Sequence, residues 1–532
     1  MSNRKKRGRV RELTRPAGLA ARDALALVED GRLFYNGYPT PLEGMKEGEK
    51  QLVSMGAYIC IFPDKLYYNT EDPADYGSME AEFSYEGRVE YSMCTAAGED
   101  YEDVRFSAAA PEEPADGQYW ADTKNGSLSL YSADTGLWVT VESVYTKLRF
   151  TSQGRIPAAF STHDGVDLQG AHFESLNGSK IIWSMGGSAQ SGEQDYIVVQ
   201  GEPAENYVQE NARISIRRSV PDMDYVCQCH NRLWGCFYGN DGSQNLNEIY
   251  ACALGDFKNW NQFMGLSTDS FRASVGSDGV WTGAVNYLGS PLFFKEERIH
   301  RVEVSSVGAH RVGETVCRGV QSGSHKSLAV INETLYYKAP ACVCAYQGGF
   351  PENISAALGD ERRFNAAACG FGAKYYISME NRAGDWELFV YDSSRGLWIR
   401  EDGLRCDHFA AVDGELYCVS GDTLWALQGT QGEPEKKVDW EAETGLLSCS
   451  DPDRKYIQRL TLRFAMAAEA SLSVYIEYDS SGSWELAGRV QPTRAGAARL
   501  PLRLRRCEHI RLRLCGSGDI KLISLTREEC RG

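Results

Sequence analysis

The chain has 532 residues, of which 42% are hydrophobic and 11% aromatic, and this composition excludes a disordered chain and allows more than one folded core. Its formal net charge of −17 at pH 7 disfavours general binding to nucleic acid or to an acidic membrane surface. The 16 cysteines are spread too thinly for a disulfide-stabilised scaffold.

Residues 1–19 are expected to form a basic N-terminal arm. The opening segment MSNRKKRGRVRELTR contains one acidic residue and a group of basic residues: Arg4, Lys5, Lys6, Arg7, Arg9, Arg11 and Arg15. Such a segment is either a solvated, poorly ordered terminus or an electrostatic arm that grips an acidic partner. The sequence shows neither the apolar region of a secretory signal nor an 18-residue apolar run that predicts a membrane span.

Residues 20–430 are predicted to form a β-propeller. Short apolar and aromatic runs recur behind turn residues at positions 125, 177, 231, 281, 332, 372 and 414, in steps of 40 to 54 residues. Several short strands per repeat of this length are typical of propeller blades, because a four-stranded sheet needs neighbouring sheets to cover both faces. We expect about six to eight blades and almost no helix, with Ala20–Val28 as the best helical candidate.

The stretch 230–263 shows one such repeat most clearly. It reads HNRLWGCFYGNDGSQNLNEIYACALGDFKNWNQF: a strand, a polar loop, a second strand and an acidic-aromatic tail that ends at Trp260. Large aromatic side chains in such repeats pack between blades. We assign this role to a set of tryptophans: Trp183, Trp234, Trp260, Trp281, Trp386, Trp398 and Trp425.

Residues 435–532 are predicted to form a separate β-sandwich. A polar Gly/Pro-containing segment at 429–435 resembles a linker, and the pattern beyond it changes to longer alternating strands. These strands are expected at 456–466, 471–479, 484–490, 497–505, 509–516 and 519–528. About 100 residues with this pattern fit a sandwich of jelly-roll or immunoglobulin size.

The sequence offers little evidence for catalysis. We find no nucleophile elbow, P-loop, dinucleotide fingerprint or HExxH helix, so we expect no enzyme activity, no cofactor and no metal. Cys227-Gln228-Cys229 and Cys342-Val343-Cys344 allow a zinc interpretation, but structural zinc pairs are usually separated by two to four residues. Since residues i and i+2 of a strand share a face, core packing explains both pairs.

A glycan-binding or sialidase-like, glycoside-hydrolysing propeller is the alternative. In that case Trp120, Trp138 and Tyr238 would stack on sugar rings, with carboxylates such as Asp134 or Asp278 nearby. The segments 132–138 and 277–281 approach the Asp-box hairpin of sialidases without matching its spacing. Tight hairpins at blade edges also favour Asp and Gly at these places.

The repeat at 231–260 also carries a resemblance to a known family. A strand with Arg-Leu-Trp precedes a strand whose tail contains Gly-Asp and Trp, and the segments DSFRASVGSDGVWTGAVNYLGSPLFFKEERIHRV and GVQSGSHKSLAVINETLYYKAPACVCAYQG follow. Over about residues 210–430 the chain resembles the β-propeller structural proteins of tailed bacteriophages. These include tail stabilisation and nozzle proteins of short-tailed phages and related prophage tail proteins. The resemblance marks Arg232, Trp234, Asp256 and Trp260 as a structural signature.

The resemblance implies a virion structural protein that acts in tail assembly, tail stabilisation or host adsorption through protein–protein contacts. The implied partners are other tail proteins and, for adsorption, a host cell-surface glycan. A homo-oligomeric ring is expected on the same grounds. The implied location is the virion tail, assembled in the cytoplasm of the host bacterium.

Overall fold

The computed structural model describes residues 4–151, 159–187, 195–202, 205–240, 242–305, 310–448, 457–491, 494–505 and 507–529. Helix in these ranges is limited to three short 3-10 turns, η1 (Glu174–Leu176), η2 (His325–Ser327) and η3 (Ala356–Leu358), and none could cross a membrane. The chain divides into two compact units. One comprises Ala17–Trp386 and Val390–Trp398, and the other comprises Met1–Pro16, Glu387–Phe389 and Ile399–Gly532.

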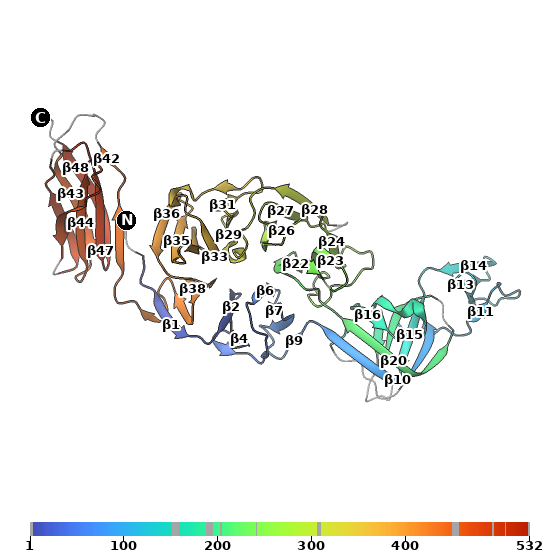
Figure 1. Cartoon of the computed structure of the whole chain (residues 1–532). Helices are drawn as coiled ribbons and strands as arrows, with labels where there is room; N and C mark the ends of the chain where they lie inside the picture. The colour runs from blue at the N-terminus through green and yellow to red at the C-terminus, as the bar shows by residue number, and fades with distance from the viewer. Residues whose placement is uncertain are drawn as a thin grey trace. The chain divides into compact units, whose positions relative to one another are not determined.

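Six four-stranded sheets follow one another as propeller blades, each with its strands in sequence order (Figure 1). Blade 1 has β2 (Pro16–Ala21), β3 (Leu25–Glu29), β4 (Arg32–Tyr35) and β5 (Tyr38–Pro39). Blade 2 has β6 (Gln51–Met55), β7 (Tyr58–Phe62), β8 (Leu66–Asn69) and β9 (Tyr76–Ser78). Blade 3 has β21 (Tyr225–Cys229), β22 (Arg232–Asn240), β23 (Asn245–Ala251) and β24 (Phe271–Ser274). The expected all-β, multi-bladed propeller is therefore present.

The remaining three of these sheets have the same construction. Blade 4 has β25 (Gly283–Tyr287), β26 (Ser290–Lys295), β27 (Arg298–Glu303) and β28 (Arg311–Val316). Blade 5 has β29 (Ala329–Ile331), β30 (Thr334–Lys338), β31 (Val343–Tyr346) and β32 (Glu352–Asn353). Blade 6 has β33 (Arg363–Phe371), β34 (Lys374–Asn381), β35 (Trp386–Asp392) and β36 (Leu397–Asp402).

Tight turns explain why the polar residues at the start of each repeat recur. Asp30 and Gly31 join β3 to β4 with φ values of 50° and 72°, and His230 and Asn231 join β21 to β22 with values of 49° and 53°. Two consecutive residues with positive φ form the hairpin turns whose twist matches the strands, and Asp, Asn and Gly tolerate this conformation best. These turns fix the hairpin register of the blades.

The blades bury their apolar residues in the seams between them. The first strands of neighbouring blades lie side by side, as β6 with β21, β21 with β25 and β29 with β33. Leu33 and Ile59 belong to the core between blades 1 and 2, and Leu292 and Tyr337 belong to the core between blades 4 and 5. Radial stacking thus covers both faces of each sheet.

An inserted domain of residues 81–218 separates blade 2 from blade 3. Its larger sheet has the order β17-β16-β20-β10-β15-β19-β18 and curves round a core of its own (Figure 1). The strands are β10 (Ala81–Cys94), β15 (Tyr145–Phe150), β16 (Gly165–Gln169), β17 (Gly178–Ile181), β18 (Ser184–Gly186), β19 (Asp195–Gln200) and β20 (Tyr207–Arg218). A smaller sheet contains β11 (Arg105–Ser107), β12 (Tyr119–Asp122), β13 (Ser127–Ser132) and β14 (Leu137–Val141).

This insertion corrects two details of the sequence prediction. The repeats that open at positions 125 and 177 lie inside it and are not blades, so residues 20–430 are not one uninterrupted propeller. Trp183 contacts Tyr145 and His163 within the inserted domain and does not pack between blades. Hairpins with polar turns give the same spacing in either kind of sheet, so spacing alone could not separate them.

The seventh sheet combines the two ends of the propeller sequence. Its order is β37-β38-β39-β1-β40, where β1 is Gly8–Glu12, β37 is His408–Val412, β38 is Glu415–Ser420, β39 is Thr423–Ala426 and β40 is Glu433–Pro434. Gly8 pairs with Ala426 on one side and with Pro434 on the other. The expected arm at residues 1–19 is therefore wrong from residue 8 onward, because this segment supplies β1 and most of β2. The best helical candidate, Ala20–Val28, is not a helix, since it contains the end of β2, a bend and the start of β3.

The C-terminal unit ends in the expected β-sandwich. One sheet has the order β41-β47-β44-β45, with β42 also on β47, and the other has the order β46-β43-β48. The strands are β41 (Asp439–Glu443), β42 (Leu447–Ser448), β43 (Ile457–Met466), β44 (Ser471–Tyr478), β45 (Glu485–Val490), β46 (Gly496–Leu502), β47 (His509–Ser517) and β48 (Ile520–Glu529). Alternate residues of both sheets, such as Leu462, Phe464 and Leu512, fill one core.

Candidate functional site

The signature residue Arg232 acts as a buried brace for blade 3. Its guanidinium donates hydrogen bonds to the carbonyl oxygens of Cys252, Ser267 and Asp269 at 2.6, 2.7 and 2.6 Å. Burial lowers the pKa of Arg232. Three backbone acceptors offset part of the cost of burying the charge and tie β22 to the loop that follows β23.

The signature tryptophans are packing residues of the same blade. Trp234 has no exposed surface, and its Nε1 donates to the carbonyl oxygen of Cys229 at 3.1 Å. Trp260 is 4% exposed and donates to the carbonyl oxygen of Phe257 at 2.8 Å. Both rings are buried and both indole N–H groups are used, which fits a packing role for each.

The acidic-aromatic tail also holds the inserted domain. Asp256 accepts from the Lys258 backbone N–H at 3.0 Å, which shapes the turn before Asn259. Asn259 is 1% exposed, accepts from the Gly165 N–H at 3.0 Å and donates to the His163 carbonyl oxygen at 2.8 Å. The tail thus docks β16 of the inserted domain on blade 3. Sequence reasoning missed Asn259, although its position beside Trp260 in a polar tail was visible.

A buried ion pair strengthens this junction. Arg218, the last residue of β20, lies 2.6 Å from the Asp164 carboxylate, and both side chains are 2% exposed. Arg218 also donates to the carbonyl oxygens of Met79 and Ala159 at 3.1 and 2.5 Å. Burial raises the pKa of Asp164 even though the Arg218 guanidinium acts in the opposite direction. Arg218 therefore ties the end of β20 to the residue before β16 and to Met79, which precedes β10.

The structure brings two of the three candidate glycan residues together. On the smaller sheet of the inserted domain, Trp120 pairs with Ser129, Ser129 with Thr140, and Tyr131 with Trp138. Directly opposed residues and residues two apart share one face of a sheet. These five residues therefore form one surface, which we name the aromatic face.

The rings of the aromatic face are half-buried and fixed. Trp138 lies between Trp120 and Tyr131, with ring centroids 5.5 and 5.2 Å away. The indole N–H of Trp120 donates to the Ser107 carbonyl oxygen at 3.1 Å. Leu128 on the opposite face belongs to a buried core with Met93, so the aromatic face points away from that core. Positioned rings beside hydroxyl side chains suit a ligand with both apolar and polar surfaces.

The third candidate, Tyr238, is in a different sheet. It lies on β22 with 41% exposure, and the Lys295 ammonium lies 5.5 Å from its ring centroid. The carboxylates Asp134 and Asp278 are exposed, Asp134 in the turn between β13 and β14 and Asp278 in the segment between β24 and β25. Hydrolysis of a glycoside needs two carboxylates that face the same bond. Asp134 and Asp278 belong to different parts of the fold, so neither supplies the partner of the other within one sheet.

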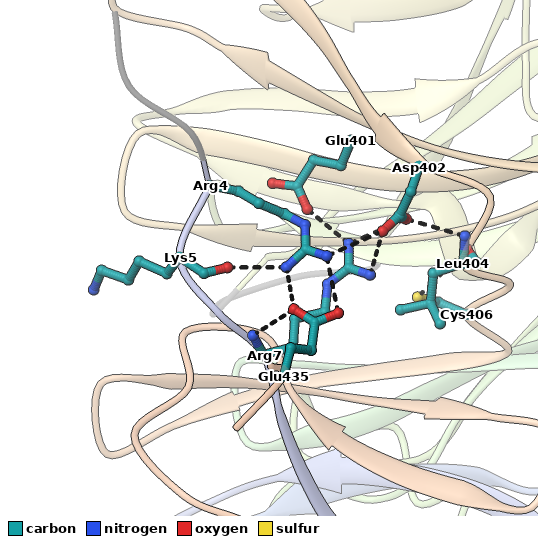
Figure 2. A network of polar contacts seen from close by, with 8 residues as sticks. All are labelled: Arg4, Lys5, Arg7, Glu401, Asp402, Leu404, Cys406 and Glu435. Carbon is teal, nitrogen blue, oxygen red and sulfur yellow. Dashed lines mark hydrogen bonds and ion pairs between the residues drawn. The ribbon is translucent and has the colours of Figure 1, made fainter. Parts of the chain in front are cut away.

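Two of the basic N-terminal residues are committed to contacts inside the protein (Figure 2). Arg7 is 3% exposed and binds Asp402 at 2.6 Å and Glu401 at 2.8 Å. Arg4 binds both carboxylate oxygens of Glu435, at 2.5 and 2.9 Å. Burial lowers the pKa of Arg7, but the neighbouring carboxylates outweigh burial and raise it overall. We name these five residues the N-terminal clasp.

The other basic residues of this segment are exposed or half-buried. Arg9 forms only an exposed pair with Glu12, at 2.6 Å, and Arg11 donates weakly to the Glu12 carbonyl oxygen at 3.4 Å. Lys5 and Arg15 are exposed, and Lys6 is half-buried. The structure therefore leaves part of the candidate partner-binding arm on the surface and builds the rest into the fold.

A polar cluster connects blades that are not neighbours in sequence. Glu49, just before β6 of blade 2, lies 3.1 Å from His325 and 3.3 Å from Lys326, which precede β29 of blade 5. Tyr225 on β21 packs against the His325 ring at 5.0 Å. The Glu49 carboxylate is paired with the Lys326 ammonium and also contacts the His325 ring, which suits a structural brace.

A cleft of about 350 Å³ opens beside blade 3. It is lined by Ser219, Pro221, Asp222, Phe237, Asn240, Leu246, Tyr250, Trp260, Asn261 and Arg272. Its charged residues are paired, Arg272 with Glu248 at 2.7 Å and Asp222 with Lys65 at 2.8 Å. Across the described parts of the chain, no group of three or more His, Cys, Asp or Glu residues could hold a metal ion.

Comparisons with known proteins give only distant matches to solved structures. No family model and no curated protein matches the chain. An exo-β-1,3-galactanase from Phanerochaete chrysosporium is 10% identical over 56% of this chain and 95% of its own, with a TM-score of 0.23. A family 43 arabinoxylan arabinofuranohydrolase from Bacillus subtilis is 9% identical over 57% and 95%, with a TM-score of 0.19. An acylaminoacyl peptidase from Pyrococcus horikoshii is 8% identical over 77% and 52%, with a TM-score of 0.28.

Proposed function

We propose that this protein is a tail-associated structural protein of a phage or prophage virion. It acts in tail assembly or stabilisation, or in host adsorption through protein–protein contacts. The observation that carries the proposal is the use of the family-like signature. The side chains of Arg232, Trp234 and Trp260 are buried in the protein interior. The tail after Asp256 contacts the inserted domain through Asn259. A propeller built in this way serves as a rigid mount for further β domains.

The proposal includes assembly with other tail proteins in a homo-oligomeric ring, since closed symmetric assembly is common among structural oligomers. Exposed basic residues near the N-terminus, such as Lys5 and Arg9, support contact with an acidic partner surface. They lie beside the buried clasp, so their backbone positions are fixed before a partner arrives. Pre-ordering of this kind lowers the entropic cost of binding.

Complementation of a gene deletion tests the assembly role. The source phage or prophage lacking this gene should yield defective particles, and the wild-type gene should restore them. Trp234→Ala should fail to restore particles because blade 3 loses its core, whereas Arg9→Gln should restore them at low salt with reduced efficiency at high salt. Normal particles without the gene product would exclude a structural role.

Glycan binding by the aromatic face is the second candidate function. Half-buried, fixed tryptophan rings beside Ser129 and Thr140 favour it, because a pyranose ring presents apolar C–H faces and polar hydroxyl edges. In a tail protein, glycan binding would serve host adsorption. It would also be a function in its own right if the protein were not a tail protein. Binding rather than cleavage is favoured, since Asp134 lies in a hairpin of the inserted domain and Asp278 lies in the segment between blades 3 and 4.

Purified protein on a bacterial glycan array tests this second function. Trp138→Ala should abolish retention on the glycans that the wild type binds. Val139→Ala changes the next residue of the same strand, which points to the opposite face, and should bind like the wild type. Equal binding by both variants would exclude the aromatic face as the contact surface.

A further inference from the structure

The two Cys-x-Cys segments have the same spacing but different surroundings. Cys342 immediately precedes β31 and Cys344 lies in it; both belong to the core between blades 4 and 5, and their sulfur atoms are 3.6 Å apart. Cys227 and Cys229 lie on β21, and within the described residues their sulfurs make no such contact. The second pair therefore provides an internal reference for the first.

Cations surround only the pair in blade 5. The positive charges of Arg318 and Lys338 both favour a thiolate at Cys342, and Lys338 on β30 pairs with Val343, the residue between the two cysteines. Lys338 is 3% exposed, and its Nζ donates to the Ala339 carbonyl oxygen at 2.5 Å. Cys317 and Tyr337 also face this cluster. Both cysteines are buried, at 7% and 0% exposure, but adjacent thiols beside two cations share the electropositive setting of reactive thiols.

We propose that Cys342 and Cys344 form a redox-active dithiol that hydrogen peroxide converts into an intramolecular disulfide. The Cys342 thiolate attacks one peroxide oxygen, the O–O bond breaks, and a sulfenic acid and hydroxide form. The Cys344 sulfur then attacks the Cys342 sulfur, the S–O bond breaks, and hydroxide leaves as water with the thiol proton. Two thiols lose two electrons in total, and one peroxide becomes two waters.

The electrostatics of the two pairs agree with this geometry. The hydrogen bond from Cys344, together with Arg318 and Lys338, lowers the pKa of Cys342 to about 6 against the effect of burial. Burial lowers the pKa of Lys338 to about 8. In the reference pair, burial alone raises the pKa of Cys229 to about 11, and it also raises the pKa of Cys227. Of the two pairs, only the blade 5 pair contains a cysteine whose pKa is lowered.

Tryptic peptides separate the two pairs cleanly. Cleavage after Lys338 and Arg362 gives peptide 339–362, whose only cysteines are Cys342 and Cys344. Cleavage after Arg218 and Arg232 gives peptide 219–232, whose only cysteines are Cys227 and Cys229. The folded full chain is treated with hydrogen peroxide at pH 7, denatured, alkylated with iodoacetamide, digested and analysed by mass spectrometry.

We expect peptide 339–362 to lose two hydrogens and resist alkylation until it is reduced, at a rate about tenfold or more above that of peptide 219–232. Equal rates, or faster oxidation of the reference pair, would overturn the proposal. Arg318→Gln, which removes the charge and keeps most of the side-chain length, should slow the reaction several-fold. Cys344→Ser should stop at the sulfenic acid, which dimedone labels at Cys342. Absence of that label in a variant that melts like the wild type would equally contradict the assignment.

Discussion

Replacement of Arg7 by glutamine should destabilise the seventh sheet much more than the same replacement at Arg9. Arg7 is 3% exposed and binds Asp402 and Glu401, which are 34% and 13% exposed. Removing one partner of a buried ion pair costs about 3–5 kcal/mol, because the charge left behind is poorly hydrated. Partial exposure of Asp402, and its contact with Arg4 at 3.4 Å, place the expected loss near the lower end, at about 3 kcal/mol.

Arg9 is the matched control because it lies two residues away and also forms an ion pair. Its pair with Glu12 joins side chains that are 48% and 79% exposed. Exposed pairs of this kind contribute about 0–1 kcal/mol. Arg9→Gln should therefore change the free energy of unfolding by less than about 1 kcal/mol.

Hydrogen exchange resolves the effect in a chain with several cores. The amides of β1 and β39, paired at Gly8 and Ala426, should exchange much faster in Arg7→Gln and almost as in the wild type in Arg9→Gln. Urea unfolding of the same variants gives the free-energy difference. Equal protection in both variants would show that the N-terminal clasp does not stabilise the sheet.

Three further outcomes follow from other contacts. Trp234→Ala should cost about 3–5 kcal/mol in thermal or urea unfolding, because it empties a fully buried core site. Burial acts to raise the pKa of Glu435. The hydrogen bonds from Arg4 and Arg7 act in the opposite direction and outweigh burial, so the pKa lies below its ordinary value of 4.5. The stability difference between wild type and Glu435→Gln should thus be full at pH 6–7 and shrink as the pH falls below about 4.5, in pH-dependent unfolding. Trp138→Ala should abolish glycan retention while circular dichroism keeps its all-β signature, and an unchanged dissociation constant would refute the aromatic face.

Local patterns predicted much of the fold. Alternation of apolar and charged residues placed the six long sandwich strands within a few residues of β43 to β48, because a strand with one buried face must alternate. Polar turn pairs such as His230 and Asn231 marked hairpins, since they accept positive φ values. These signals depend on residues that are close in sequence, so they can be recognised without knowledge of the tertiary structure.

Contacts between residues far apart in sequence explain the features that the sequence did not predict. The segment around Arg7 looked like a free basic arm, since its carboxylate partners lie about 400 residues away in sequence. The inserted domain went unrecognised because its hairpins repeat at nearly the blade interval. Of the candidate glycan residues, Trp120 and Trp138 meet through strand register, which spacing alone does not give. Tyr238 also lies in an aromatic-rich segment of the sequence, but the structure places it in β22 of blade 3.

Imaging of purified phage particles produced by the source organism tests the proposed tail role most directly. The account predicts tail density in which several copies of this chain, each with its blades, inserted domain and sandwich, surround the tail axis as a ring. Mass spectrometry of the same particles should find the chain at a stoichiometry that matches the ring. Complete tails whose density and protein content lack this chain would contradict the account.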